Sequence, residues 1–264
     1  MAEGSDVRPP RRRATGAGAA GSDAGRMASI HQWSPELQKA RVYEQILLDI
    51  ILGELAPGAR LDEQALARRY DAGLAGIRDA LGRLALEDLV IRKARAGTTV
   101  APLDIIELRQ ALEARALIEP HCAALAARCA SSEELAELAR VFDGAEAAIR
   151  NRDCRSLVAM DQRFHAGIAR ASRNATLARI IIPLQHKAAR FWIYSLDYDT
   201  EEERIEEIAR HMAVVECIAQ GDAERARATM FDLLGTFSDN MRRAAMGIAG
   251  GALRTPAAAG LPAS

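Results

Sequence analysis

Apolar residues between positions 36 and 53 recur at the intervals that place them on one face of a helix. Gly53 and the turn Ala56-Pro57-Gly58 end this segment, and two shorter amphipathic segments follow at 63–70 and 74–88. We therefore predict three helices, of which the second and third are separated only by a short break.

A basic stretch between two β-branched pairs follows the third helix. Val90-Ile91 and Thr99-Val100 favour strands, and the stretch between them ends in Gly97, so we predict a two-stranded hairpin. Helix, helix–turn–helix and hairpin, in this order, make up a winged helix-turn-helix. We expect this DNA-binding domain over residues 34–102.

Residues 103–248 show helical periodicity almost throughout. Polar residues such as Ser131, Asn174 and Thr200 mark helix starts, and Gly221 marks an end. The predicted helices span 103–129, 133–151, 153–172, 175–197, 201–220 and 222–248. The expected fold class is thus mainly α: a winged helix-turn-helix with a small β-hairpin, followed by an antiparallel all-α bundle of about six helices.

Composition narrows the possible functions. Of the 264 residues, 49% are hydrophobic and only 4% aromatic, which favours helix over strand. The formal net charge of −1 gives no general attraction to nucleic acid, so a DNA-binding surface has to be local. Residues 1–33 and 249–264 hold few side chains that could pack, and we expect disordered tails there. The four cysteines form no Cys-x-x-Cys pair and no apolar run reaches the roughly 20 residues of a membrane span, so we expect a cytoplasmic protein with free thiols and no membrane partner.

The order of short motifs resembles the GntR family of bacterial transcription regulators, in its FadR-like subfamily. In the first domain the matching residues are Pro57-Gly58, Leu61, Leu66-Ala67, Arg78-Asp79-Ala80-Leu81, Leu84, Asp88-Leu89-Val90 and Gly97-Thr98-Thr99-Val100. In the helical part they are Arg115, Ile118-Glu119-Pro120, Asp161, Phe164-His165, Asn174, His211 and Gly221-Asp222. The resemblance covers residues 38–245, and implies a homodimer whose helical domain, residues 103–248, binds a small-molecule effector.

The chain departs from the family pattern at the tip of the third helix. The family usually has Ser-Arg-Thr-Pro there, where this chain has Gly73-Leu74-Ala75-Gly76. A tip without bulky side chains lets backbone N–H groups approach a phosphate closely, and Leu74 and Ala75 are able to meet thymine methyl groups. Arg78 follows one turn later, opposite the apolar stripe. The alternative is that the helix tip has lost its contacts with DNA and that the domain serves only for packing or dimerisation.

The predicted hairpin supplies local positive charge. Residues 41–100 contain nine Lys and Arg against nine Asp and Glu, but no acid lies between Leu89 and Val100. A basic wing beside the recognition helix is able to contact phosphates and to reach into the minor groove. The predicted contacts to double-stranded DNA are Gln64, Gly73, Leu74, Ala75, Gly76, Arg78, Arg92, Lys93, Arg95 and Gly97.

A metal site is predicted in the helical part. Asp161 and His165 are four residues apart and so project from one face of a helix, as two ligands of one ion require. The family resemblance adds His211 as a third ligand and places a fourth at position 233, where this chain has Leu233. We expect zinc or another divalent ion with three protein ligands and a position open to water or a small carboxylate. The alternative is that both histidines are hydrogen-bonded core residues in a bundle that binds no metal. We also expect an organic ligand in the same cavity.

Two arginines are candidates for pairing an anionic effector, Arg115 and Arg163, although arginines on helices are more often surface ion-pair partners. Together these features predict a DNA-binding transcription regulator, most often a repressor in such families, controlled by a carboxylate-type effector. The alternative is a dimeric sensor or accessory protein of the same fold that does not read DNA. An enzyme is disfavoured, because no Glu lies beside Asp161 and His165 on their helix face to act as the general base of a metal-dependent hydrolase.

Overall fold

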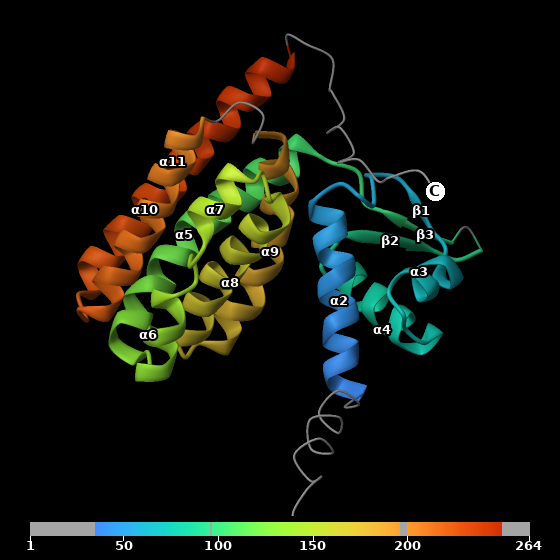
Figure 1. Ribbon diagram of the computed structural model, residues 1–264, viewed down its shortest axis with the longest axis horizontal. Helices are drawn as coiled ribbons and strands as arrows, with labels where there is room; N and C mark the ends of the chain where they lie inside the picture. Colours follow the sequence, from blue (N-terminus) through green and yellow to red (C-terminus); the bar gives the residue numbers. More distant parts are fainter. Residues whose placement is uncertain (1–34, 96, 196–199, 250–264) are drawn as a thin grey trace, which may run out of the picture.

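The computed structural model describes residues 35–95, 97–195 and 200–249, with side chains described for 39–95, 97–192 and 200–236. The expected tails, 1–33 and all but the first residue of 249–264, lie outside this part. Figure 1 shows two lobes: one holds α2 to α4 with a small sheet, and the other holds a bundle of helices from α5 to α11. The expectation of a mainly α chain with a winged helix-turn-helix and a helical bundle is confirmed.

The smaller lobe has the order of a winged helix-turn-helix. It consists of α2 (Pro35–Ile51), β1 (Arg60–Leu61), α3 (Glu63–Arg69), α4 (Leu74–Leu86), β2 (Val90–Lys93) and β3 (Gly97–Val100). The sheet is antiparallel with the order β1-β3-β2, so the predicted two-stranded hairpin is one strand short. Arg60 pairs with Thr99 across the additional β1–β3 ladder. A two-residue strand is too short to show a periodicity, and its pairing is a long-range contact.

The core of this lobe lies between α2 and α4. Ile46 of α2 and Ile77, Leu81 and Leu84 of α4 are fully buried, as the apolar spacing predicts. The N-cap residue Asp62 starts α3, since its Oδ1 accepts from the backbone N–H of Ala65 at 2.6 Å.

The larger lobe is helical throughout the part of it that is described. Its elements are α5 (Ile105–Cys129), α6 (Ser132–Ala139), α7 (Ala145–Arg150), α8 (Cys154–Ala171), α9 (Ala175–Ser195), α10 (Glu201–Ala219) and α11 (Ala223–Ala249). The prediction of one helix over 133–151 is wrong, because α6 and α7 are separate. Gly144 adopts a left-handed conformation with φ +84°, which an α-helix does not tolerate. In the described residues the bundle therefore has seven helices instead of about six.

Polar caps set several of these helix starts where the sequence placed them. Ser131 and Glu134 form a reciprocal capping box before α6, and Thr200 and Glu203 form another before α10. Asn174 accepts from the backbone N–H of Leu177 at the start of α9. Among the described helices, none combines the length and the apolar content that a membrane crossing needs.

The two lobes pack directly on one another. Val158 of α8 and Ala189 of α9 are buried within the core cluster of the smaller lobe, and Trp192 packs against the cores of both lobes. α8 and α9 are therefore the elements through which the bundle contacts the winged domain.

Candidate DNA-binding surface and metal centre

The N-terminus of α4 is exposed and carries almost no side chain. Its N-cap residue, Gly73, has extended backbone angles and provides no side-chain cap. Leu74 and Ala75 are exposed, and a Cβ atom added to Gly73 or Gly76 would meet nothing within 4 Å. The described part of the chain thus leaves the tip of α4 open. The first backbone N–H groups of a helix have no partner within it, so this tip is suited to an anion such as phosphate.

Arg78 lies on the exposed face of α4, one turn from the tip. Its Nε donates to Oε2 of Glu63 at 2.7 Å, and its side chain is 61% exposed. This pair joins the two helices of the helix-turn-helix, with Gln64 exposed beside it on α3. An exposed ion pair contributes at most about 1 kcal/mol, so a DNA phosphate or a guanine edge is able to displace Glu63 at small cost.

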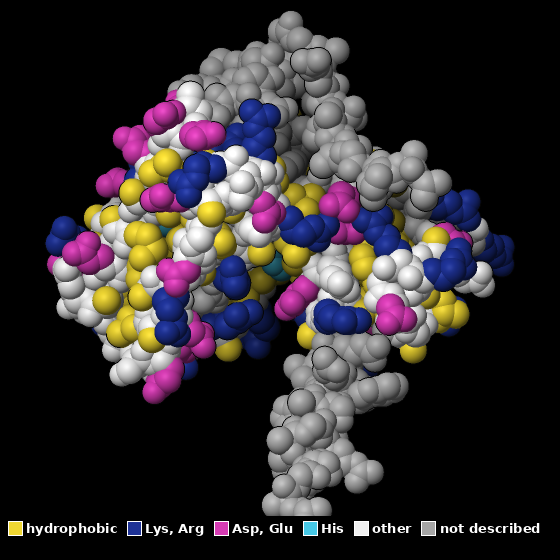
Figure 2. Space-filling model, in the orientation of Figure 1, with side chains coloured by type: hydrophobic (Ala, Val, Ile, Leu, Met, Phe, Trp, Pro, Cys, Tyr) yellow, Lys and Arg dark blue, Asp and Glu magenta, His cyan; other side chains and the backbone are white. Residues whose placement is uncertain are grey.

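The wing carries the basic side chains that the sequence predicted. Arg92 and Lys93 of β2 and Arg95 of the following turn are all exposed, and Gly97 begins β3 with φ +92°. Lys and Arg side chains gather at the outer edge of the lobe that carries the sheet (Figure 2). The wing and the tip of α4 together form the candidate DNA-binding surface.

Arg60 is a further basic residue of this surface that the sequence analysis missed. It is exposed on β1, and its guanidinium lies 3.5 Å from the position of a Cβ atom added to Gly97. A lone arginine after a turn gives no signal of its own in the sequence. Only the pairing of β1 with β3 places it next to the wing.

Two polar clusters connect this domain to the bundle. In the first, the Arg155 Nη2 of α8 donates to Asp49 at 2.5 Å and to Glu54 at 2.7 Å, and Asp49 also accepts from Arg69 and from the Tyr70 hydroxyl. Asp49 is buried, so the arginines and the hydroxyl compensate its charge.

In the second cluster, Glu87 at the end of α4 accepts from the Tyr43 hydroxyl at 2.7 Å and from Nδ1 of His186, on α9, at 2.8 Å. Arg83 lies over the Tyr43 ring at 3.7 Å and pairs with Glu87 at 3.5 Å. Burial raises the pKa of Glu87, but the hydrogen bonds and positive charges around it lower the pKa more, so the net direction is down. Glu87 is thus a carboxylate that holds α9 to the end of α4.

The predicted metal ligands converge in the bundle. The Asp161 Oδ1 of α8 lies 3.5 Å from Nε2 of His165 and 3.5 Å from Nε2 of His211, which α10 provides. All three ligand atoms lie within 4.8 Å of one another. Two ligands of a tetrahedral zinc ion are separated by about 3.3–3.6 Å when each is about 2.0–2.2 Å from the metal. The donor set therefore fits a divalent ion with a small inward movement.

The hydrogen bonds made by Nδ1 of His165 and His211 orient the Nε2 atom of each ring toward Asp161. Nδ1 of His165 donates to Glu119 at 2.6 Å, and Nδ1 of His211 donates to the Glu207 carbonyl at 2.7 Å, since a carboxylate and a carbonyl only accept. A carboxylate or carbonyl on the second ring nitrogen is the usual arrangement around a metal-bound histidine. The sequence did not predict Glu119 in this role, because it lies on α5, 46 positions away from His165.

Asp161 and His165 form an ion pair at 3.5 Å, and Nε2 of His211 lies equally close to Asp161. Burial raises the pKa of Asp161, but the charges and hydrogen bonds of both histidines lower the pKa well below its usual range. Burial lowers the pKa of His165, but the charges of Glu119 and Asp161 raise it to about 9. A divalent ion held here would require His165 to give up its Nε2 proton.

Arg115 and Leu233 close the cavity around these ligands. Arg115 is buried, with Nε 2.5 Å from Oε1 of Glu119 and Nη2 3.3 Å from Nε2 of His165. Leu233, at the position where the resemblance placed a fourth ligand, is 4% exposed. The cavity has a volume of about 20 Å³, which holds an ion or a single water. A sugar acid or a similar organic molecule does not fit there.

Arg163 does not line this cavity, in contrast to the prediction that it pairs an effector there. Its side chain is exposed, its Nε donates to the Ala159 carbonyl at 3.2 Å, and it borders a separate groove together with Glu134 and Glu137. It is two positions from both Asp161 and His165, and on a helix this spacing turns a side chain about 200° away from either of them.

Comparisons with known proteins agree with this architecture. Residues 38–100 match the family model of bacterial regulatory proteins, gntR family, and residues 104–236 match the FCD domain. The HTH-type transcriptional regulator LutR of Bacillus subtilis is 27% identical over 211 residues, with 71% of this chain and 93% of LutR covered. The HTH-type transcriptional repressor RspR of Escherichia coli is 20% identical over 203 residues, with 77% and 88% covered.

Solved structures show the same fold. The structure of E. coli McbR/YncC superposes with a TM-score of 0.67 at 21% identity, with 78% of this chain and 97% of that chain covered. A putative transcriptional regulator GntR from Rhodococcus sp. RHA1 gives a TM-score of 0.57 at 20% identity, with 82% and 99% covered. The chain belongs to the GntR family of transcription regulators, with a winged helix-turn-helix followed by an FCD effector-binding domain.

Proposed function

We propose that the protein is a repressor that binds a short pseudo-palindromic DNA site through the tip of α4 and the basic wing. The observation that carries the proposal is the open tip: Gly73 and Gly76 have no neighbour that would exclude a phosphate, and Arg78 follows on the same exposed face. The wing residues Arg92 and Lys93 add positive charge beside it. RspR, which is similar over most of its length, is named as a repressor.

The proposed regulator responds to a ligand of its helical domain. Asp161, His165 and His211 would hold a divalent metal, which would supply a positive charge and a coordination position for water. Arg115 at the cavity wall adds a second positive group, balanced by Glu119. These three ligands connect α8 and α10, so a bound ion stabilises one arrangement of the two helices.

Contacts from α8 and α9 offer a route from this centre to the DNA-binding domain. α8 carries Asp161 and, six positions earlier, Arg155, which contacts Asp49. Gln185 of α9 donates to the Asp161 carbonyl at 3.3 Å, and its neighbour His186 contacts Glu87. A ligand changes DNA affinity only if it binds one arrangement of the two domains better than another. These contacts would carry that preference.

We further propose a homodimer, because a pseudo-palindromic site requires two winged domains. Exposed apolar side chains lie on two helices that pack against each other: Leu117 of α5 is 80% exposed and Phe231 of α11 is 57% exposed. A symmetric interface over α5 would remove Leu117 from water.

Selection of genomic DNA fragments on the purified protein, followed by affinity measurements from 50 to 200 mM salt, tests the proposal. If each wing of a dimer neutralises three phosphates, the logarithm of the binding constant falls with the logarithm of salt concentration with a slope of about −5. A protein that retains no fragment at 50 mM salt is instead the sensor that does not read DNA, and the repressor proposal is then wrong.

A further inference from the structure

A large cavity lies between the two domains, outside the metal centre. Its volume is about 540 Å³, compared with about 20 Å³ around the metal ligands. Cavities of roughly 300–1,000 Å³ are the size that binds small organic molecules. This interdomain cavity is thus large enough for an organic ligand, whereas the space around the metal ligands is not.

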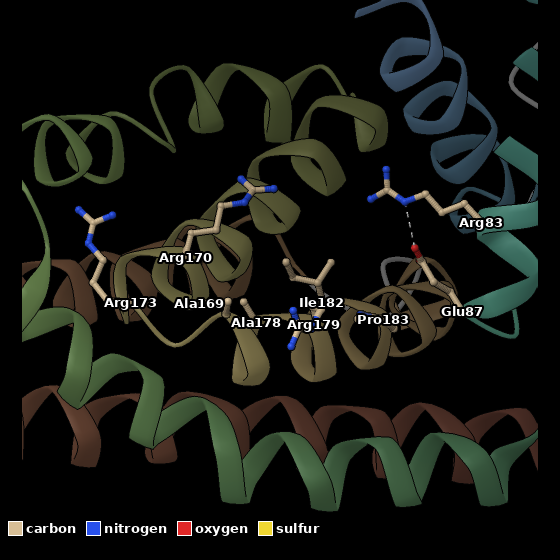
Figure 3. Close-up of a pocket in the computed structure, with 10 residues that line it drawn as sticks. Arg83, Glu87, Ala169, Arg170, Arg173, Ala178, Arg179, Ile182 and Pro183 are labelled. Atoms are coloured by element: carbon tan, nitrogen blue, oxygen red, sulfur yellow. Dashed lines mark ion pairs between the residues drawn. The ribbon is translucent and has the colours of Figure 1, made fainter. Parts of the chain in front are cut away.

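Four arginines line this cavity. Arg83 comes from the end of α4, Arg170 from α8, Arg173 from the α8–α9 connection and Arg179 from α9. In Figure 3 the side chains of Arg83 and Arg170 extend toward one another from opposite sides of the open space, and Arg179 projects from its floor. The one acidic residue of the lining, Glu87, already accepts from Tyr43 and His186. The cavity is therefore strongly positive.

Two of these arginines have no acidic partner among the described residues. Arg173 pairs with Glu134 at 2.8 Å and Arg83 pairs with Glu87 at 3.5 Å. Arg179, in contrast, donates only to the hydroxyl of Thr176 at 3.2 Å, and Arg170 makes no ion pair within the described part. Guanidinium groups bind carboxylates and phosphates through paired N–H bonds. The two unpaired groups are available to an anion.

The remaining wall is apolar. Ala169 and Ala178 are buried, and Ile182 and Pro183 of α9 line the cavity beside them. An inorganic ion alone would leave this wall uncovered. Arginines opposite an apolar wall match a small organic molecule with two or more negative charges.

We propose that this interdomain cavity binds a small organic polyanion, a phosphorylated or polycarboxylate metabolite, through Arg170 and Arg179. The ligand would bridge α8 and α9 to Arg83, next to the contact between Glu87 and His186. Its effect on DNA binding rests on the proposed function, whereas anion binding itself does not. A binding measurement without DNA therefore separates the two.

The test is isothermal titration calorimetry of the metal-free full-length protein with pyrophosphate and with citrate, at constant ionic strength. We expect one site per chain for at least one of the two anions. We expect Arg170→Ala/Arg179→Ala to weaken binding at least 10-fold, and the control Arg109→Ala/Arg150→Ala to leave it unchanged. The control arginines are exposed on α5 and α7 and pair only within their own helices.

Three outcomes would overturn this proposal. The first is that neither anion binds the wild-type protein. The second is that the two double variants bind equally. The third is that Asp161→Asn, which alters the metal centre alone, removes the binding. If the first outcome is found and Arg170→Ala/Arg179→Ala also lowers DNA affinity, the arginines contact the DNA backbone instead.

Discussion

Replacing Gly76 by Ala separates the stability of α4 from its proposed contact with DNA. Gly76 is the third residue of α4, has no positive φ, and an added Cβ would meet nothing within 4 Å. Alanine in a helix is more favourable than glycine by about 0.5–1 kcal/mol, and nothing in the described surroundings opposes this gain. We therefore expect Gly76→Ala to raise the free energy of unfolding by about 0.5–1 kcal/mol, measured by urea denaturation.

We expect the same substitution to weaken DNA binding. If backbone N–H groups at the tip donate to a phosphate, a methyl group there holds the phosphate away. The loss of one hydrogen bond to a charged group amounts to about 1.5–3 kcal/mol, or roughly a 10- to 100-fold lower affinity. We expect fluorescence anisotropy with a selected DNA fragment to show this loss at constant salt.

Gly235→Ala is the matched control. Gly235 is exposed in α11, and a Cβ atom added there also meets nothing within 4 Å. This variant should gain similar stability and bind DNA like the wild type. Unchanged DNA affinity in Gly76→Ala, together with the expected gain in stability, would refute close approach of the helix tip to DNA.

Three other substitutions test the metal centre, the domain contact and the dimer. Leu233→His adds a fourth ligand to the metal centre. Because the four ligands of a zinc site together contribute about 10–16 kcal/mol, one ligand adds roughly 3 kcal/mol, and calorimetry with Zn²⁺ should show about 100-fold tighter binding. No gain in a folded variant would argue against the metal centre. Glu87→Gln, beside Tyr43, Arg83 and His186, should lower stability by about 1–3 kcal/mol at neutral pH. Because the pKa of Glu87 is lowered in the folded protein, its carboxylate contributes to stability above the ordinary pKa of 4.5, and this contribution is lost as the pH falls below that value. Urea denaturation should therefore show the unfolding free energies of wild type and Glu87→Gln converging at low pH. A difference in stability that stays constant with pH would contradict the role of the charge. Leu117→Glu should shift sedimentation from dimer to monomer without loss of helix content, and an unaltered dimer would place the interface elsewhere.

Local patterns were sufficient to predict most elements of the fold. Capping residues such as Ser131 and Thr200 act on backbone groups three positions away, so the sequence alone locates them. The break at Gly144 was missed because a single glycine is also tolerated within a helix, and only the observed φ of +84° identifies it as a stop. β1 was missed because its pairing joins Arg60 to Thr99, which no local pattern encodes.

The functional sites could likewise be predicted where a local pattern places their residues, and not where they depend on packing. The i, i+4 spacing placed Asp161 beside His165, and the family resemblance brought in His211, and these three residues do converge. The partner of His165, Glu119, depends on how α5 packs against α8 and therefore could not be predicted. The arginine-lined cavity is also a product of packing, since Arg83 and Arg179 are far apart in the chain and lie in different domains.

The central claim, that α4 enters duplex DNA, is tested most directly by the affinity of Arg78→Ala for a selected genomic fragment. Arg78 is 61% exposed and loses only its surface pair with Glu63, so the variant should fold like the wild type. We predict a loss of about 1–3 kcal/mol in specific binding, roughly 10- to 100-fold, with unchanged affinity for Arg128→Ala, an exposed arginine of α5. Wild-type affinity in the folded Arg78→Ala variant would contradict the proposed mode of DNA binding.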